Sequence, residues 1–155
     1  MEILRIDKNK KTNVQLTKDY RPNPAMVNEF QTMFFTLKLN HVEIVDHELN
    51  DFVIDDMAQY LILDVSIHNI TNEILSMFKY DFLLSFDSEE PYEPEDYFEV
   101  GHQLENEYAL KPNEMKRGRI IYIIAKNAHK ITFRFTEYFD DDSEGKTYRL
   151  KYELK

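Results

Sequence analysis

The chain has 155 residues, 43% of them hydrophobic and 31% charged, which fits one globular domain and excludes a disordered tail. It carries 29 acidic and 19 basic residues and a net charge of −10, which argues against nucleic acid as a partner because phosphate neutralisation needs a basic surface. The absence of cysteine excludes disulfides and thiolate metal sites, and the few glycines leave no room for a glycine-rich phosphate loop.

Residues 1–29 are predicted to form an N-terminal arm or linker, and residues 30–155 are predicted to form the domain itself. The stretch 8–29 is polar and contains Pro22 and Pro24, whereas residues 3–6 could form a short edge strand. Clustered lysines from residue 8 onward interrupt the apolar run that a signal peptide needs, and no apolar run of about 18 residues predicts a transmembrane segment. The chain as given is therefore expected in the cytoplasm, or in the cell envelope or medium if a signal peptide has been removed.

From residue 30 onward, hydrophobic and polar residues alternate with a period of two, which is typical of strands with one buried face. The first row is expected to continue past a bend at Asn40 into Val42 and Ile44. The inward residues are predicted to be Met33, Phe35, Leu37 and Leu39, then Leu61, Leu63, Val65 and Ile67, then Phe78, Tyr80, Phe82, Leu84 and Phe86, then Ile131, Phe133 and Phe135, and finally Tyr148, Leu150, Tyr152 and Leu154.

The segments between these rows are mostly polar. Residues 46–57 and 87–99 are rich in acids and are predicted to be loops, whereas residues 100–109 fit either a short strand or a helical turn. Residues 119–125 are apolar on both faces, as expected of a central strand that is covered on both sides. About seven short strands without a long helical pattern predict an all-β fold, an immunoglobulin-like antiparallel β-sandwich.

Three stretches together resemble a known family. They are a strand over residues 60–69 that ends in Asn69, a strand over residues 80–84 followed by Pro91-Tyr92, and the turn Leu110-Lys111-Pro112-Asn113-Glu114 ahead of Gly118. In this order they are similar to the telokin-like, immunoglobulin-type domains of unknown function found in bacterial lipoproteins and surface proteins. The resemblance covers residues 30–154 and implies a β-sandwich with no known catalytic residue. Asn113 stands where the family has glycine, and the lipoprotein signal with its cysteine is absent.

The acidic stretch over residues 140–145 partly matches a calcium-binding loop. Asp140, Asp142 and Glu144 occupy alternate positions ahead of Gly145, and carboxylate oxygens in such a pattern can converge on a hard cation. The calcium pattern also needs a glutamate six residues after the glycine, where this chain has Lys151. A solvated acidic hairpin and a calcium site therefore both remain open, and calcium is the one cofactor considered.

Four aromatic residues lie in or near the long middle loop and form a candidate partner-binding surface, because tyrosine is enriched in protein interfaces. The alternative is that this loop packs onto the sandwich. The four residues are Tyr92, Tyr97, Phe98 and Tyr108.

No catalytic constellation is evident in the sequence, which has neither a Gly-x-Ser-x-Gly motif nor a His-Glu-x-x-His motif. The first hypothesis is a non-enzymatic protein-binding or assembly module, and the alternative is a calcium- or cation-responsive domain that uses the hairpin at residues 140–145. A hydrolase with a carboxylate pair in a cleft is a weaker third reading. The N-terminal arm or an exposed sheet edge could also pair with a second copy and form a homo-oligomer.

Overall fold

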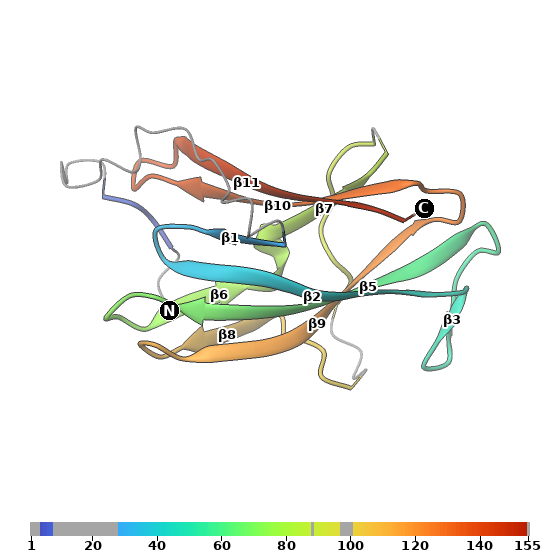
Figure 1. Ribbon diagram of the computed structural model, residues 1–155, viewed down its shortest axis with the longest axis horizontal. Helices are drawn as coiled ribbons and strands as arrows, with labels where there is room; N and C mark the ends of the chain where they lie inside the picture. The colour runs from blue at the N-terminus through green and yellow to red at the C-terminus, as the bar shows by residue number, and fades with distance from the viewer. Residues whose placement is uncertain (1–3, 8–27, 88, 97–100, 155) are drawn as a thin grey trace.

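Two antiparallel sheets face each other in the computed structural model, which describes residues 4–7, 28–87, 89–96 and 101–154 (Figure 1). The larger sheet has the strand order β1-β2-β5-β9 and the smaller sheet the order β11-β10-β7. The all-β sandwich predicted from the alternating rows is therefore confirmed. Strand bounds are β1 Glu29–Gln31, β2 Phe35–Val45, β5 Ala58–Asn69, β7 Phe82–Phe86, β9 Met115–Ala125, β10 Lys130–Tyr138 and β11 Glu144–Glu153.

Most of the predicted inward residues meet between the sheets in an aromatic layer, whereas Tyr152 near the end of β11 is 41% exposed and was wrongly predicted to face inward. Phe35 from the larger sheet makes an edge-on contact with Phe135 of the smaller one, with ring centroids 5.0 Å apart. Phe82 stacks on Phe133 at 5.6 Å, and Phe30 stacks on Tyr148 at 5.3 Å. Aromatic pairs at such distances add roughly 0.5–1.5 kcal/mol each beyond the area that they bury, so this layer is a main source of the domain's stability.

A β-bulge at Asn40 changes which side chains of β2 face the core. Leu39 pairs with Val65 and His41 with Asp64, so Asn40 is the extra residue. The bulge shifts the inward positions from odd to even numbers, which lets Val42 pack against the core as the sequence predicts.

The row from residue 78 to residue 86 is not one strand, and this prediction is wrong. The chain forms β6 (Leu75–Phe78), a 3₁₀ turn (Lys79–Asp81) and then β7, and these two strands pair with different partners. β6 pairs with β8 (Glu107–Leu110), which settles the ambiguous stretch 100–109 as partly strand, whereas β7 pairs with β10. The turn is where the chain crosses between sheets, and it buries Lys79, whose pKa burial lowers.

Residues 46–57 also differ from the predicted loop. They contain the hairpin formed by β3 (Glu48–Leu49) and β4 (Phe52–Val53), which projects from one end of the larger sheet (Figure 1). Leu49 and Ile54 of this segment pack on a second apolar cluster on the outer face of that sheet, centred on Tyr60, Ile62 and Ile121. The hairpin thus covers apolar side chains on the outer face of β5 and β9, which would otherwise face solvent.

The N-terminal residues that the structure describes belong to the smaller sheet. Ile6 is 3% exposed, donates its backbone N–H to the Tyr138 carbonyl at 3.0 Å and accepts from the Asp140 N–H at 2.9 Å. Residues 4–7 therefore extend the sheet beyond the start of β7, so the arm predicted over residues 1–29 is in part a piece of the sandwich. Residues 8–27 lie outside the described chain.

Asn69 joins two turns at one end of the sandwich. Its fully buried Nδ2 donates to the carbonyls of Glu73, Leu110 and Lys111 at 2.7, 3.0 and 3.0 Å. Its Oδ1 accepts from the N–H and hydroxyl of Thr71, both at 2.8 Å. One side chain thus satisfies backbone groups at the β5–β6 and β8–β9 turns that would otherwise be buried without partners.

The neighbouring turn explains how the chain tolerates Asn113 in place of glycine. Asn113 has φ +63°, and the Glu114 N–H donates to the Lys111 carbonyl at 3.0 Å, which closes the turn. Asparagine adopts this left-handed conformation more readily than most non-glycine residues, so the turn forms as the resemblance implies.

Replacing Asn69 with alanine is predicted to lower the free energy of unfolding by about 2–4 kcal/mol, because one buried and two partly buried carbonyls would lose a donor. Urea denaturation would measure the loss, with the exposed Asn72→Ala in the same turn as the control, expected to cost less than about 0.5 kcal/mol. Equal losses in the two variants would contradict the role assigned to Asn69.

Candidate functional site

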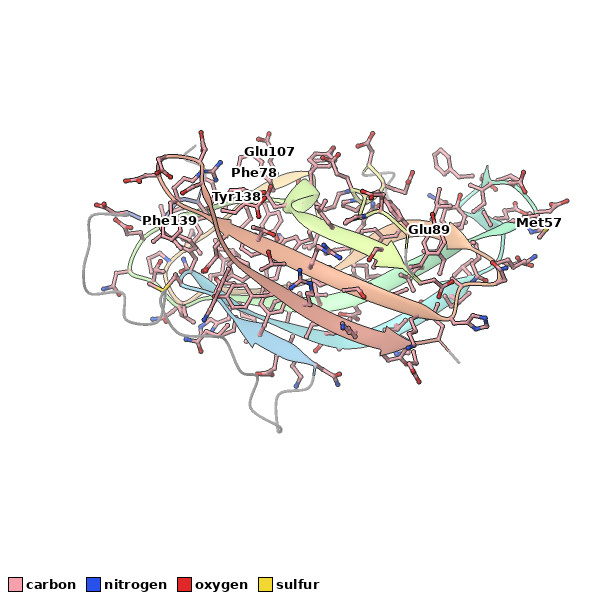
Figure 2. All side chains as sticks on the ribbon, turned by 90° about the horizontal axis from the view of Figure 1, so that it is seen from above. Met57, Phe78, Glu89, Glu107, Tyr138 and Phe139 are labelled. Atoms are coloured by element: carbon pink, nitrogen blue, oxygen red, sulfur yellow. The ribbon has the colours of Figure 1, made fainter. Side chains whose placement is uncertain are left out.

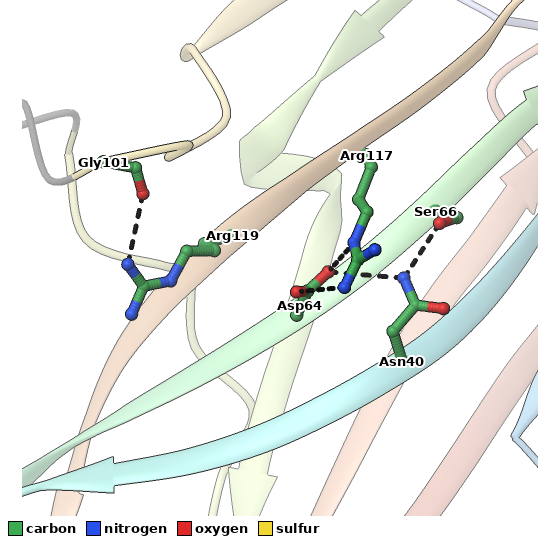
Figure 3. A network of polar contacts seen from close by, with 6 residues as sticks. All are labelled: Asn40, Asp64, Ser66, Gly101, Arg117 and Arg119. Carbon is green, nitrogen blue, oxygen red and sulfur yellow. Dashed lines mark hydrogen bonds and ion pairs between the residues drawn. The ribbon is translucent and has the colours of Figure 1, made fainter.

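The outer face of the larger sheet divides into a covered apolar half and an open polar half. The polar half carries Asn40 from β2, Asp64 and Ser66 from β5, and Arg117 and Arg119 from β9 (Figure 3). Their positions follow from strand register, since Asp64 pairs with Arg119 and Ser66 with Arg117. Adjacent strands thereby place two arginines and a carboxylate on one solvent-facing surface, which we call the polar network.

Asp64 is the centre of the polar network. Arg117 donates from Nε and Nη2 to Oδ1 and Oδ2 of Asp64 at 2.9 and 3.0 Å, and Asn40 Nδ2 donates to Oδ1 at 3.3 Å (Figure 3). The hydrogen bonds from Arg117 lower the pKa of Asp64 below its ordinary value. Asp64 therefore stays ionised near neutral pH and is poorly suited to proton transfer.

Arg119 extends the polar network toward the loop before β8. It donates from Nη2 to the Glu43 carboxylate at 3.1 Å and from Nη1 to the Gly101 carbonyl at 3.2 Å. A cavity of about 330 Å³ lies here, lined by Asp64, His102, Arg117, Gly118 and Arg119. Gly118 is required at this place because a Cβ would collide with the side chain of Leu104.

Two arginine–carboxylate ion pairs dominate the polar network. Arg117 and Arg119 each offset a carboxylate, and no nucleophile with an activating base is present among its residues. Bidentate arginine–carboxylate geometry fixes direction as well as charge, so the surface is suited to contacting polar groups of another molecule. The polar network is not predicted from the sequence. The pattern that indicates it is a single aspartate within an otherwise apolar strand, Asp64, together with arginines at alternate positions of another strand, Arg117 and Arg119.

Large apolar side chains are exposed on the projecting hairpin and the residues that follow it, at one end of the larger sheet. Phe52 is 52% exposed, Val53 65% and Met57 71%. The surrounding segment 46–57 is acidic and has no lysine or arginine. Only Asp46 of these acids has a lysine partner in the described structure, Lys126 at 2.9 Å, and this contact lowers the pKa of Asp46. We call residues 52–57 the hairpin patch.

The aromatic residues predicted to bind a partner are not available as one surface. Tyr108 is 6% exposed and belongs to the core, and Tyr92 is half-buried, with its hydroxyl donating to the Ile123 carbonyl at 2.6 Å. Burial raises the pKa of both tyrosines. Tyr108 is therefore not exposed and Tyr92 is only partly exposed, because the loop after β7 lies against β7 and β9. Tyr97 and Phe98 lie outside the described residues, and partner binding by these aromatic residues stays a prediction.

The predicted calcium residues surround the β10–β11 turn. Asp142 has φ +66°. Its Oδ1 accepts from Arg5 Nε at 3.0 Å, so the charge of Arg5 already offsets that of this carboxylate. Within the described ranges, no three acidic or histidine side chains are grouped so that they could hold a metal ion. Calcium binding by Asp140, Asp142 and Glu144 remains a prediction, which titration with calcium would test.

No protein-family model matches the chain, and no curated protein matches it. Solved structures do resemble it. The candidate lipoprotein ycdA of Bacillus subtilis strain 168 has a TM-score of 0.66 at 16% identity over 81% of this chain, which spans 38% of ycdA. The Bacillus subtilis protein yjhA has a TM-score of 0.58 at 18% identity, covering 78% of this chain and 93% of its own.

A protein of unknown function from Listeria monocytogenes EGD-e also matches, with a TM-score of 0.55 at 13% identity over 82% of this chain and 81% of its own. At these identities the matches show a shared fold, a β-sandwich. Among the described residues, no helix has the length and hydropathy needed to cross a membrane.

Replacing Arg117 with glutamine is predicted to raise the pKa of Asp64 toward its ordinary value. Because the folded-state pKa is lowered, the stability that Asp64 contributes is present above its unfolded pKa of about 3.9 and is lost as the pH falls through the lower folded value. Carboxyl-carbon NMR titration of Asp64 would follow the change. The matched control is Arg149→Gln on the smaller sheet, and an Asp64 pKa that moves equally in both variants would contradict the pairing.

Proposed function

We propose that the domain is a non-enzymatic protein-binding module that contacts its partner through the hairpin patch. The observation that supports this proposal is the concentration of Phe52, Val53 and Met57 in six residues at one end, each more than half exposed. Clustered exposed apolar side chains ringed by polar residues are typical of protein interaction sites. The open polar network on the same sheet would form the polar rim of such an interface.

The charge around the hairpin patch favours a basic partner. Acidic side chains flank it on both sides of the β3–β4 turn, and the whole chain carries a net charge of −10. Electrostatic complementarity speeds encounter and disfavours wrong partners. We therefore infer a protein partner that presents lysine or arginine around an apolar spot.

We also propose that the domain belongs to the telokin-like, immunoglobulin-type domains and is located in a bacterial cell envelope. The Asn69 clamp and the Asn113 turn support membership of the telokin-like, immunoglobulin-type domains, since both are motifs that suggested the resemblance. The likeness to the candidate lipoprotein ycdA supports a place in a bacterial cell envelope over the cytoplasm. A homo-oligomer through the N-terminal arm or the outer edge of β11 remains a further prediction; within the part of the chain that the structure describes, β11 pairs with β10 alone.

The double variant Phe52→Ser/Val53→Ser is predicted to lose partner binding while the sandwich stays folded, because both side chains are exposed and outside the core. Affinity capture from native cells with the wild-type chain would identify the partner, and binding of that purified partner would then be measured. We expect the affinity for this partner to fall at least about tenfold, because removing a buried interface anchor commonly costs about 1.4 kcal/mol or more of binding free energy.

The matched control is Ile74→Ser/Met115→Ser, which removes exposed apolar side chains from another part of the sandwich. It should leave the affinity unchanged. A partner that binds both double variants equally well, or a screen that recovers none, would count against the hairpin patch as the contact surface.

A further inference from the structure

A groove on the smaller sheet lies where the pairing of β10 with β7 ends and its contact with residues 4–7 begins. Phe135 pairs with Phe82 of β7, and from Tyr138 onward β10 instead contacts residues 4–7. Two cavities, of about 290 and 190 Å³, occupy the gap between these neighbours. They share four lining residues and so lie next to each other, and we call the two together the groove; the shared residues are Tyr80, Asp81, Thr136 and Tyr138.

Asp81 lies in the middle of the groove, where both cavities meet. Among the described residues, its carboxylate has no hydrogen bond and no ion pair within 4 Å. Solvent reaches it, yet surrounding protein raises its pKa through desolvation, an effect that the charge of Arg5 only partly offsets. Arg5 is itself held by Asp142 at 3.0 Å. A solvent-accessible carboxylate that lines both cavities and has no protein donor can accept from a ligand that brings a positively charged donor.

Arg134 lines the smaller cavity together with Asp81. It projects from β10 opposite Leu83, and its Nε is buried and has no hydrogen-bond partner. Among the described residues no acceptor pairs with the outer nitrogens of this guanidinium either, and these nitrogens are not buried, so this end of the groove favours a ligand with an anionic or carbonyl oxygen. The groove thus presents an unpaired acceptor and an unpaired donor in one cavity.

The larger cavity has an aromatic and apolar wall, formed by Leu4, Phe34, Phe78, Tyr80, Phe135 and Tyr138. Phe78 and Tyr138 lie at the same end of the molecule (Figure 2). Two rings are fixed by polar contacts, because the Tyr80 hydroxyl donates to Asp96 at 2.7 Å and the Arg5 guanidinium lies 5.2 Å from the Tyr138 ring centroid. This wall fits an apolar side chain of a few carbon atoms.

The remaining charges of the groove favour a ligand that carries an ammonium group. Glu93 lines the smaller cavity, and Glu137 lines the larger one. The two carboxylate oxygens of Glu137 already accept from the Met33 N–H at 2.7 Å and the Tyr148 hydroxyl at 3.0 Å, so Glu137 is committed to the fold. Three carboxylates against two arginines disfavour a ligand that is only anionic.

We propose that this groove binds a zwitterionic α-amino acid with an apolar side chain. Its ammonium group would donate to Asp81, its carboxylate would accept from Arg134, and its side chain would occupy the aromatic cavity. This site goes beyond the proposed protein-binding function and lies on the other sheet from the hairpin patch. A single zwitterionic ligand would pair with both Asp81 and Arg134, which line the same cavity and lack partners among the described residues.

Calorimetric titration of the full chain with leucine tests the proposal, with 3-methylbutylamine and 4-methylpentanoate as analogues that each lack one charged group. Leucine is expected to bind, and each analogue is expected to bind at least about tenfold more weakly. A leucine-containing dipeptide distinguishes a free amino acid from a peptide end, since the groove is expected to prefer the free amino acid. No heat with leucine up to millimolar concentration would overturn the proposal.

Two variants assign the roles of the charged residues. Asp81→Asn should weaken leucine and the amine but leave 4-methylpentanoate unaffected, and Arg134→Gln should weaken leucine and the carboxylate but leave the amine unaffected. Asp81→Asn should keep or raise the midpoint of thermal unfolding, because the charge that it removes is disfavoured by burial.

The matched controls are Asp56→Asn and Lys38→Gln, which each remove one charge of the same sign at exposed positions that line neither cavity. Both should bind leucine as the wild-type chain does. Equal weakening in the controls would show a general effect of net charge and would overturn the site, as would an Asp81→Asn variant that binds leucine normally.

Discussion

The packing of Phe82 between the two sheets is the contact on which the rest of the structure depends. Its ring lies 6.0 Å from that of Phe35 on the larger sheet and 5.6 and 5.4 Å from those of Phe133 and Phe135 on the smaller one. Because strand side chains alternate, fixing these rings inward also fixes which residues face solvent. Asp64 and Arg117 on one sheet and Arg134 on the other are outward for this reason.

The alternating pattern predicts the sandwich well because it reports burial directly. It identifies Phe35, Leu63, Phe82 and Phe133 as inward, and all four are buried. It does not locate the break at Lys79, because the row continues through that turn while the pairing partner changes from β8 to β10. Pairing depends on contacts between residues far apart in the sequence, which a local period does not report.

The functional surfaces were harder to predict for the same reason. Composition suggests that Tyr108 and the acidic stretch 46–57 lie on loops, yet Tyr108 is buried and residues 46–57 contain a hairpin. The groove around Asp81 arises from several segments far apart in the sequence, among them residues 4–5, the turn before β7, and β10. Asp81 and Arg134 lie far apart in the sequence and on different elements, so they form no motif that could be recognised from the sequence.

The two sheets divide the surface into regions of different chemistry. The larger sheet carries paired charges next to exposed apolar side chains, an arrangement suited to a macromolecular partner. The smaller sheet has a recess in which an acid and an arginine are both unpaired, an arrangement suited to a small ligand. The aromatic layer separates them, so either surface can be altered without removing a core side chain.

Amide hydrogen exchange of Phe82→Ala tests most directly whether this layer unites the two sheets. Removing a large buried ring typically costs about 3–5 kcal/mol, and if the sandwich unfolds as one unit the loss reaches both sheets. The slowest amides of β5 and of β10 are then expected to exchange faster by the same factor. Faster exchange in β10 with unchanged protection in β5 would show two sheets that unfold independently, contrary to the account given above.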